Sequence, residues 1–200
     1  MDAKLAATDH PVHELVRARW SPYGFSGELV PHEALRALFE AARWAPSSFN
    51  EQPWRYILAT RDEPEEFERL LSCLVADNQT WAKAAPVLAL GVGMLTFTRN
   101  GKPNKVAHHD LGLAAGNLLV EATARNLLVH QMGGILPERA RELYAIPEDA
   151  EALTALAIGY LGAPEDLPGD LAERDRAPRT RKPLHEFVFG QRWGQASCVL

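Results

Sequence analysis

An apolar helical stretch over residues 104–127 constrains the fold of this chain more than any other feature of the sequence. Leu111, Leu118 and the alanines near them leave little polar surface over its middle. A helix that is apolar nearly all round must be buried, either in a core or against a partner. Gly112 and Gly116 lie on this helix, and each costs about 1 kcal/mol relative to alanine inside a helix. Close approach of another helix or of a ligand would offset that cost, although a strongly packed helix could also tolerate both glycines.

A second apolar run, residues 86–95, has the length of a strand and is typical of a strand at the centre of a sheet. Further strands are predicted over residues 54–60, 127–131 and 153–160, and further helices over residues 13–19, 31–44, 65–75 and 137–144. Because helices and strands alternate without a regular βαβ rhythm, we expect an α+β domain. The stretch best suited to be a flexible joint is residues 164–178.

The size and charge of the chain argue against several classes of function. A chain of 200 residues allows one domain or two small ones, and a net charge of -5 argues against nucleic acid as a general partner. No run of 18 apolar residues occurs, and residues 1–10 lack an apolar signal region, so we expect no membrane partner and a cytoplasmic location. Cys73 and Cys198 lack the spacing typical of zinc sites, so we expect inert thiols and no metal.

A polar loop at residues 45–56 interrupts the helical pattern with small, amide and hydroxyl side chains. Pro46 and Pro53 restrict the residues before them and remove backbone donors, so the segment between them has a defined, non-helical conformation. The side chains presented there are those of Ser47, Ser48, Asn50 and Gln52. Such a loop suits a polar ligand, although an ordinary connection between helix and strand would explain it equally well.

Two groups of cationic residues predict an anion site. Arg17 and Arg19 precede Ser21, and guanidinium groups with a hydroxyl suit a phosphate well. The second group lies near the C-terminus of an otherwise acidic chain and comprises Arg174, Arg176, Arg179, Arg181 and Lys182, opposed locally by Asp175 alone. The alternative for each group is a solvated surface.

These motifs resemble those of the nitroreductase family, whose members hold FMN at a dimer interface. The loop resembles the family's Pro-Ser-Ser-x-Asn-x-Gln-Pro-Trp sequence. Arg19-Trp20-Ser21, with Arg17 before it, resembles the N-terminal Arg-x-Ser of the family, and Arg179-Thr180-Arg181 resembles its C-terminal phosphate-binding pair. The likeness extends over roughly residues 12–190, with most of its specificity in residues 45–54.

The resemblance implies a set of residues that bind FMN. Its phosphate would be held by Arg17, Arg19, Ser21, Arg179 and Arg181. Its ribityl chain and ring would contact Pro46, Ser47, Ser48 and Asn50, while Asn78 would supply an amide to the polar side of the ring. Gln131-Met132-Gly133-Gly134 resembles the turn whose backbone amide faces flavin N5, where glycines allow close approach. No side chain is required as an acid or base, so we name no catalytic residue.

The resemblance also implies a fold and a reaction. We expect a nitroreductase-like α+β fold with a central, mostly antiparallel sheet flanked by helices. Residues 1–200 would form a single FMN-binding domain, with residues 164–200 as an extension that wraps onto the partner of a homodimer whose interface holds the FMN sites. The implied enzyme passes electrons from NADH or NADPH to a nitroaromatic or quinone by a two-step exchange. Alternatives are a flavin-binding or storage protein with little turnover, and an FMN enzyme of this fold with another reductive chemistry.

Some positions depart from the family pattern or stay open. Tyr23 stands where most members have Arg or Lys beside flavin N1 and O2, which predicts a lower reduction potential unless another cation compensates. His108 and His109 start the long helix and cannot chelate a metal together, because adjacent helical residues point about 100° apart, but one of them could face the flavin. Candidate residues for stacking on a substrate are Trp44, Trp81 and Phe97.

Overall fold

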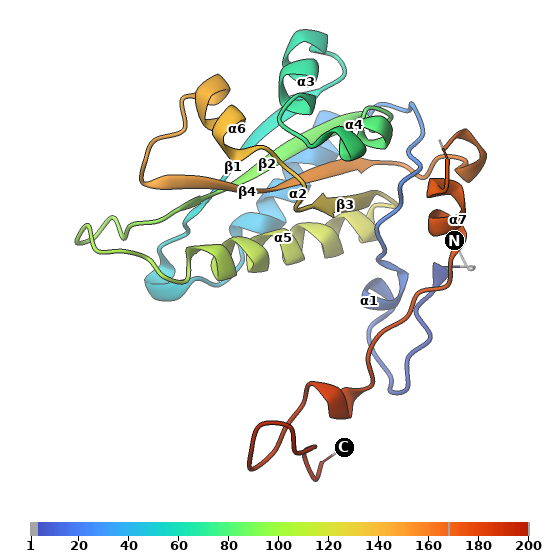
Figure 1. Ribbon diagram of the computed structural model, residues 1–200, viewed down its shortest axis with the longest axis vertical. Coiled ribbons are helices and arrows are strands. Elements are labelled where there is room, and N and C mark those ends of the chain that lie inside the picture. Colours follow the sequence, from blue (N-terminus) through green and yellow to red (C-terminus); the bar gives the residue numbers. More distant parts are fainter. Residues whose placement is uncertain (1–3, 168, 200) are drawn as a thin grey trace.

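The computed structural model describes residues 4–167 and 169–199, and its centre is one antiparallel sheet (Figure 1). The strands are β1 (Trp54–Thr60), β2 (Val87–Met94), β3 (Leu128–Met132) and β4 (Ala150–Gly159), in the order β1-β2-β4-β3. The helices are α1 (Glu14–Ala18), α2 (His32–Arg43), α3 (Pro64–Leu71), α4 (Ala76–Ala82), α5 (Ala107–Ala124), α6 (Pro137–Tyr144) and α7 (Leu171–Arg176). Short 3₁₀ turns cover Ser48–Asn50, Pro164–Asp166 and Leu184–Glu186.

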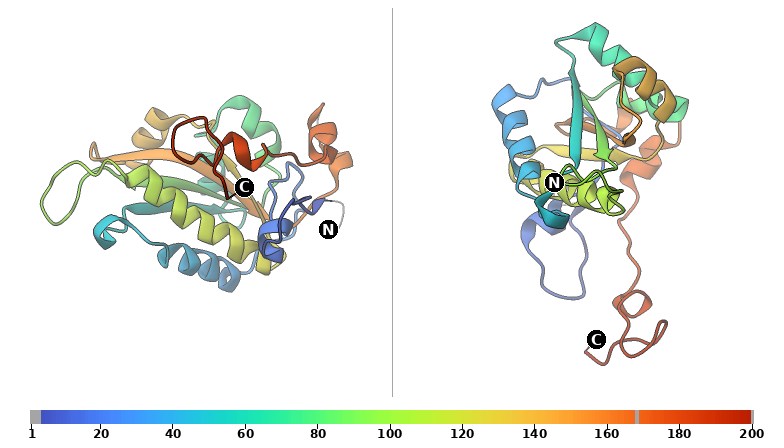
Figure 2. Two further views of the ribbon diagram at one scale, coloured as in Figure 1. Left: turned by 90° about the horizontal axis from the view of Figure 1, so that it is seen from below. Right: turned by 90° about the vertical axis from the view of Figure 1, so that its left-hand side faces the viewer.

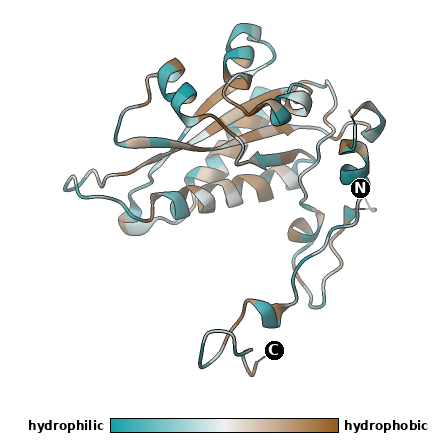
Figure 3. Cartoon of the chain, in the orientation of Figure 1, coloured by the Kyte–Doolittle hydropathy of each residue, from teal (hydrophilic) through white to brown (hydrophobic). Residues whose placement is uncertain are grey.

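Helices cover both faces of the sheet. Helices α2 and α5 lie on one face, and α3, α4 and α6 lie on the other (Figure 1). Figure 3 shows that apolar residues concentrate in the strands between these layers. Residues Val87 to Gly93 of β2 are all buried, as expected for a central strand. The predicted α+β class with an antiparallel sheet is therefore confirmed. None of the helices in the described residues is both long and apolar enough to cross a membrane.

The helix predicted over residues 65–75 is wrong at its C-terminal end. Helix α3 ends at Leu71, because the backbone of Cys73 accepts a hydrogen bond from the Leu136 N–H (2.7 Å) and Leu74 pairs with Ile135 in an antiparallel bridge. Helix α4 then begins at Ala76 and was not predicted. Cys73 is buried, and burial raises the pKa of its thiol, which keeps it protonated.

The segment predicted as a flexible joint, residues 164–178, contains a 3₁₀ turn and helix α7 in its described part. Asp175 of α7 is buried, and its Oδ1 accepts a hydrogen bond from the backbone N–H of Tyr23 (2.6 Å). A carboxylate that accepts a backbone N–H makes a charge-assisted bond, which fixes this helix against the segment at residue 23.

Helix α5 buries one face and leaves the other open. Leu111, Ala114 and Leu118 face the sheet and are buried. A Cβ atom added at Gly112 or Gly116 would meet nothing within 4 Å among the described residues. The two glycines are therefore not required by any close approach within the part of the chain that the structure describes.

The C-terminal tail extends away from the sheet layers (Figure 2). Its large apolar side chains are exposed, with 56% of Phe187 and 92% of Trp193 accessible to solvent. Burial of such aromatic surface against a partner would be favourable.

Candidate functional site

Three of the predicted phosphate-binding residues meet at one cavity near the tail, which we call the anion cavity. Arg19, Arg179 and Arg181 all line it, although they come from opposite ends of the sequence. Burial, followed by the charges of Arg179 and Arg181, lowers the pKa of Arg19, and burial together with Arg181 lowers the pKa of Arg179. Among the described residues, no carboxylate lies within 4.0 Å of these three guanidinium groups. The described cavity wall also contains Asp9, but its cations Arg19, Arg179, Arg181 and Lys182 outnumber this acid, which makes the cavity a candidate site for an anion.

The other two predicted phosphate-binding residues, Ser21 and Arg17, lie near this cavity but do not line it. Ser21 lies beside the cavity, where its Oγ accepts a bond from Arg19 Nη1 at 3.4 Å. Arg179 also has a structural role, because its Nη1 donates to the carbonyls of Lys4 (2.8 Å) and Arg17 (2.7 Å). Arg17 does not line the cavity, and its Nε lies 3.5 Å from the carbonyl of Ala6. The structure thus uses the backbone of Arg17 to position Arg179.

A second cavity, which we call the ring cavity, collects the residues predicted to surround the flavin ring. Tyr23, Asn78, Gln131, Gly133 and Gly134 line its wall, and its volume is about 700 Å³. Asn78 Nδ2 donates to the Gly134 carbonyl at 3.0 Å, and a Cβ atom at Gly134 would lie only 2.6 Å from that Nδ2. Glycine at 134 therefore lets the Asn78 amide come close, while the backbone of Gly133 meets open space.

Aromatic and cationic groups surround Tyr23 at the ring cavity. The Tyr23 ring contacts those of Trp81 and His130, with centroids 5.2 Å and 4.8 Å away, and the Arg174 guanidinium lies 5.1 Å over it. His130 Nδ1 lies 2.8 Å from the Pro22 carbonyl, which can only accept, so Nδ1 carries the proton. Burial lowers the pKa of His130, which keeps its ring neutral near pH 7.

The C-terminal cationic group predicted from the sequence is therefore not one cluster. Arg174 lines the ring cavity, Arg179 and Arg181 line the anion cavity, and Arg176 forms an ion pair with Glu165 (2.5 Å). Segment 19–23 joins the two cavities, since Arg19 lines one and Tyr23 the other. Four extended residues span at most roughly 14 Å, so one elongated ligand with an anionic end can occupy both.

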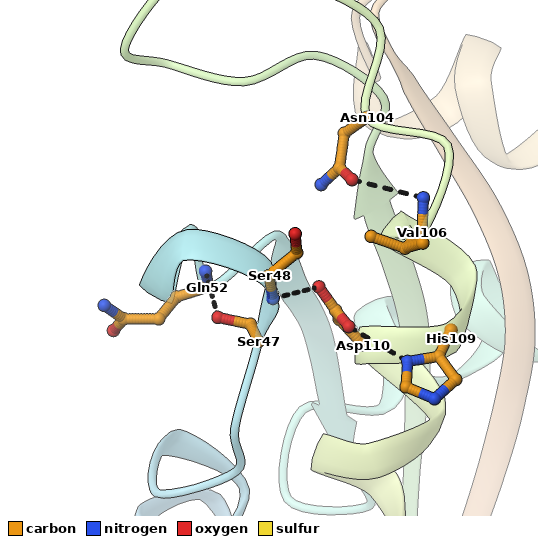
Figure 4. A network of polar contacts seen from close by, with 7 residues as sticks. All are labelled: Ser47, Ser48, Gln52, Asn104, Val106, His109 and Asp110. Atoms are coloured by element: carbon orange, nitrogen blue, oxygen red, sulfur yellow. Dashed lines mark hydrogen bonds and ion pairs between the residues drawn. The ribbon is translucent and has the colours of Figure 1, made fainter.

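The polar loop is held by a buried carboxylate that the sequence did not predict (Figure 4). Asp110 is 2% exposed and lies in the first turn of α5. Its Oδ2 accepts the Ser48 N–H at 2.9 Å, and its Oδ1 lies 3.0 Å from His109 Nδ1. Within the loop, Ser47 Oγ accepts the Gln52 N–H at 2.9 Å. A carboxylate on the buried face of an otherwise apolar helix was the available signal in the sequence.

The loop is also strained, as functional loops often are. Phe49, Asn50 and Gln52 have φ angles of 54°, 55° and 53°, a left-handed conformation that costs L-residues roughly 1–2 kcal/mol each. Pro46 and Asn50 are exposed. The bond from Asp110 offsets part of the cost of this conformation.

We expect Asp110→Ala to loosen the loop, because a hydrogen bond to a charged group contributes about 1.5–3 kcal/mol. Hydrogen exchange at the Ser48 amide should accelerate roughly tenfold to 100-fold. Asp110→Asn keeps an acceptor oxygen and should restore most of the protection. Glu138→Ala, at an exposed acid on α6, is the control. Equal exchange at Ser48 in the alanine variant and the wild type would contradict the role of Asp110.

The loop and the two cavities lie at different ends of α5. Figure 1 places residues 47–52 beside the first turn of α5 and α1 beside the opposite end of that helix. The 18 residues of α5 span roughly 27 Å. One chain thus assembles the anion cavity and the ring cavity, but Ser47, Ser48 and Asn50 remain away from both.

The remaining candidates have varied surroundings. Trp81 is buried and closes the ring cavity, whereas 73% of Trp44 is exposed. Phe97 packs edge-to-face on Phe49 with centroids 5.9 Å apart. His108 Nε2 pairs with Glu151 Oε2 at 2.9 Å.

Comparison with known proteins supports one family. The sequence profile of the Nitroreductase family matches residues 16–160. A crystal structure of an oxidoreductase containing FMN superimposes with a TM-score of 0.88 at 36% identity, covering 94% of this chain and 95% of that chain. A nitroreductase family protein of Clostridium difficile 630 has a TM-score of 0.69 at 25% identity over 89% of this chain and 96% of its own. The major NAD(P)H-flavin oxidoreductase of Aliivibrio fischeri is 26% identical over 219 residues, 90% of this chain and 98% of that protein.

Proposed function

This chain belongs to the nitroreductase family of FMN-dependent oxidoreductases, and on that premise we propose that it passes electrons from NADH or NADPH to an electron-poor acceptor such as a nitroaromatic or a quinone. When bound, FMN supplies the redox chemistry by accepting electrons from the nicotinamide and, after the nicotinamide leaves, giving them to the acceptor. The observation that carries the proposal is the short chain distance between the two cavities, since Arg19 lines the anion cavity and Tyr23 lines the ring cavity.

The residues of the two cavities suit the two ends of FMN. Arg19, Arg179 and Arg181 offer guanidinium donors to a phosphate, which would also relieve their mutual repulsion. At the other end, Gly133 and Gly134 bring backbone close to a flat ring, and the Asn78 amide lies at the same wall. The chain itself therefore binds and orients the cofactor, while the cofactor carries the chemistry.

A homodimer would complete the site. Ser47, Ser48 and Asn50 lie away from the cavities of their own chain, beside the first turn of α5. A second copy packed on the open face of α5, and related by a two-fold axis perpendicular to that helix, would carry its loop toward the cavities of the first. We therefore infer that each FMN site takes its phosphate and ring contacts from one protomer and its loop contacts from the other.

The extension at residues 164–200 has a role in the same assembly. Its proximal part, with Asp175 and Arg179, is fixed to its own chain by bonds to Tyr23, Lys4 and Arg17. The distal part carries exposed Phe187 and Trp193 on a segment that lies away from the sheet layers. Wrapping of this distal part onto the partner would bury those aromatic rings.

The absorption spectrum of the purified protein tests the proposal. We expect a yellow protein with bound FMN, and anaerobic mixing with NADH or NADPH should bleach the flavin band in a single turnover. Addition of a quinone or nitroaromatic should then restore the band. Flavin that is bound but is not reduced by either nicotinamide would indicate a storage protein, and a protein that binds no FMN would overturn the proposal.

A further inference from the structure

The ring cavity holds one cation whose role is not accounted for by the fold. Arg174 lines the cavity, with its guanidinium over the Tyr23 ring. Within residues 4–167 and 169–199, no carboxylate lies within 4.0 Å of this guanidinium, and no hydrogen bond from it is found. Its neighbour Arg176 is ion-paired with Glu165. An arginine that stabilises the fold usually has such a partner, and Arg174 has only the aromatic face beneath it.

The position of Arg174 is fixed by the residues around it. Asp175, the next residue, is buried and accepts the Tyr23 N–H at 2.6 Å, which ties α7 to the wall of the cavity. Tyr23 in turn packs against Trp81 and His130. A guanidinium over an aromatic ring gains about 0.5–1 kcal/mol at an exposed site. The charge is thus held beside Tyr23 while its donors stay free.

The other charged groups of the cavity do not replace this cation. The wall contains Asp77 and Asp170, which are anionic, and His130, whose pKa is lowered by burial and which is therefore neutral near pH 7. Arg174 is the positive side chain of the cavity wall. A positive charge near N1 tunes the electronics of a flavin, and it favours the electron-rich reduced form over the oxidised form.

We propose that Arg174 contacts the N1 and O2 edge of the bound flavin ring and raises its reduction potential, in place of the cation that is missing at position 23. The proposal rests on the proposed function, because it requires FMN in the ring cavity. Tyr23 then acts as the platform that positions the guanidinium. The lower potential predicted from Tyr23 alone is offset by a residue that lies 151 positions later in the chain.

Three variants test the proposal through the reduction potential of bound FMN, measured by anaerobic titration against a reference dye. Arg174→Gln removes the charge and should weaken binding of reduced FMN about tenfold more than binding of oxidised FMN, which lowers the two-electron potential by about 30 mV. Arg174→Lys keeps the charge and should recover at least half of that shift. Arg176→Gln, on the same helix but outside the cavity wall, should leave the potential unchanged.

The outcomes separate this inference from the proposed function. If the wild type binds FMN and Arg174→Gln has the wild-type potential, the inference fails and the proposed function stands. An equal shift in Arg174→Gln and Arg176→Gln would also overturn it, because a contact at the ring would then be indistinguishable from the general field of α7. A wild type without FMN would instead defeat the proposed function.

Discussion

The double variant Arg19→Ala/Arg181→Ala should lose FMN during purification. Each guanidinium can make a charge-assisted contact to the phosphate, and removal of both should cost about 3–6 kcal/mol of binding free energy. The dissociation constant for FMN should therefore rise roughly 150-fold to 20,000-fold, as measured by quenching of flavin fluorescence. Arg181 is the arginine whose removal should disturb the fold least, since its only hydrogen bond in the described chain is to the carbonyl of Thr180. Arg179 is avoided because it also holds the backbone of Lys4 and Arg17.

Riboflavin, which lacks the phosphate, provides the internal control for this double variant. Its affinity should be low in the wild type and nearly unchanged by the two substitutions. The matched protein control is Arg69→Ala/Arg139→Ala, which removes two arginines near α3 and α6, far from the anion cavity. Unchanged FMN affinity in Arg19→Ala/Arg181→Ala would show that the cationic cavity is only a solvated surface. An equal loss of riboflavin affinity would show that the substitutions damage the fold.

The layered core was predictable because its signals are local. The continuous apolar run over residues 86–95 indicated a central strand, and β2 is buried almost throughout. Helix α2 had a clear helical periodicity, whereas α5 was marked by its length and its high apolar content. The helix at residues 65–75 was overextended because a long-range pairing between Leu74 and Ile135 ends it, and no local pattern reveals such a pairing. Helix α7 was missed for the same reason, since its anchor is the bond from Tyr23 to Asp175.

The site was predictable in composition but not in arrangement. The loop motif predicted that Ser47, Ser48 and Asn50 belong to the site. Nothing in the sequence indicated that this loop lies at the first turn of α5, at the end of that helix that is away from the cavities. The run of C-terminal cations gave no indication that Arg174 and Arg181 serve different cavities. Asp110 carried a usable signal, because an acid on a buried helical face requires a hydrogen-bond partner.

Gly116→Leu should break the dimer and release FMN at the same time. Within its own chain, a Cβ atom at Gly116 meets nothing within 4 Å, so the substitution should leave the protomer folded and should even favour the helix by up to about 1 kcal/mol. At a two-fold interface the new side chain intrudes twice, and overpacking costs about 1–3 kcal/mol per site. The dissociation constant of the dimer should therefore rise roughly 30-fold to 20,000-fold. Sedimentation velocity at micromolar concentration measures the fraction of dimer. The flavin absorbance that moves with the protein boundary measures the FMN that stays bound.

Gly27→Leu is the matched control for this experiment, because Gly27 also has open space at its Cβ position but lies in an exposed loop away from α5. It should remain a dimer that retains FMN. Gly116→Ala should have an intermediate effect, since its single methyl group intrudes less than leucine. An obligate interface commonly buries roughly 2,000 Å² or more, so the wild type should not dissociate on dilution to micromolar concentration. Two results would refute a site shared across the open face of α5. A wild type that sediments as an FMN-loaded monomer would show that the loop of a second chain is not needed to hold the cofactor. A Gly116→Leu variant that stays a flavin-loaded dimer would show that the interface does not lie at Gly116.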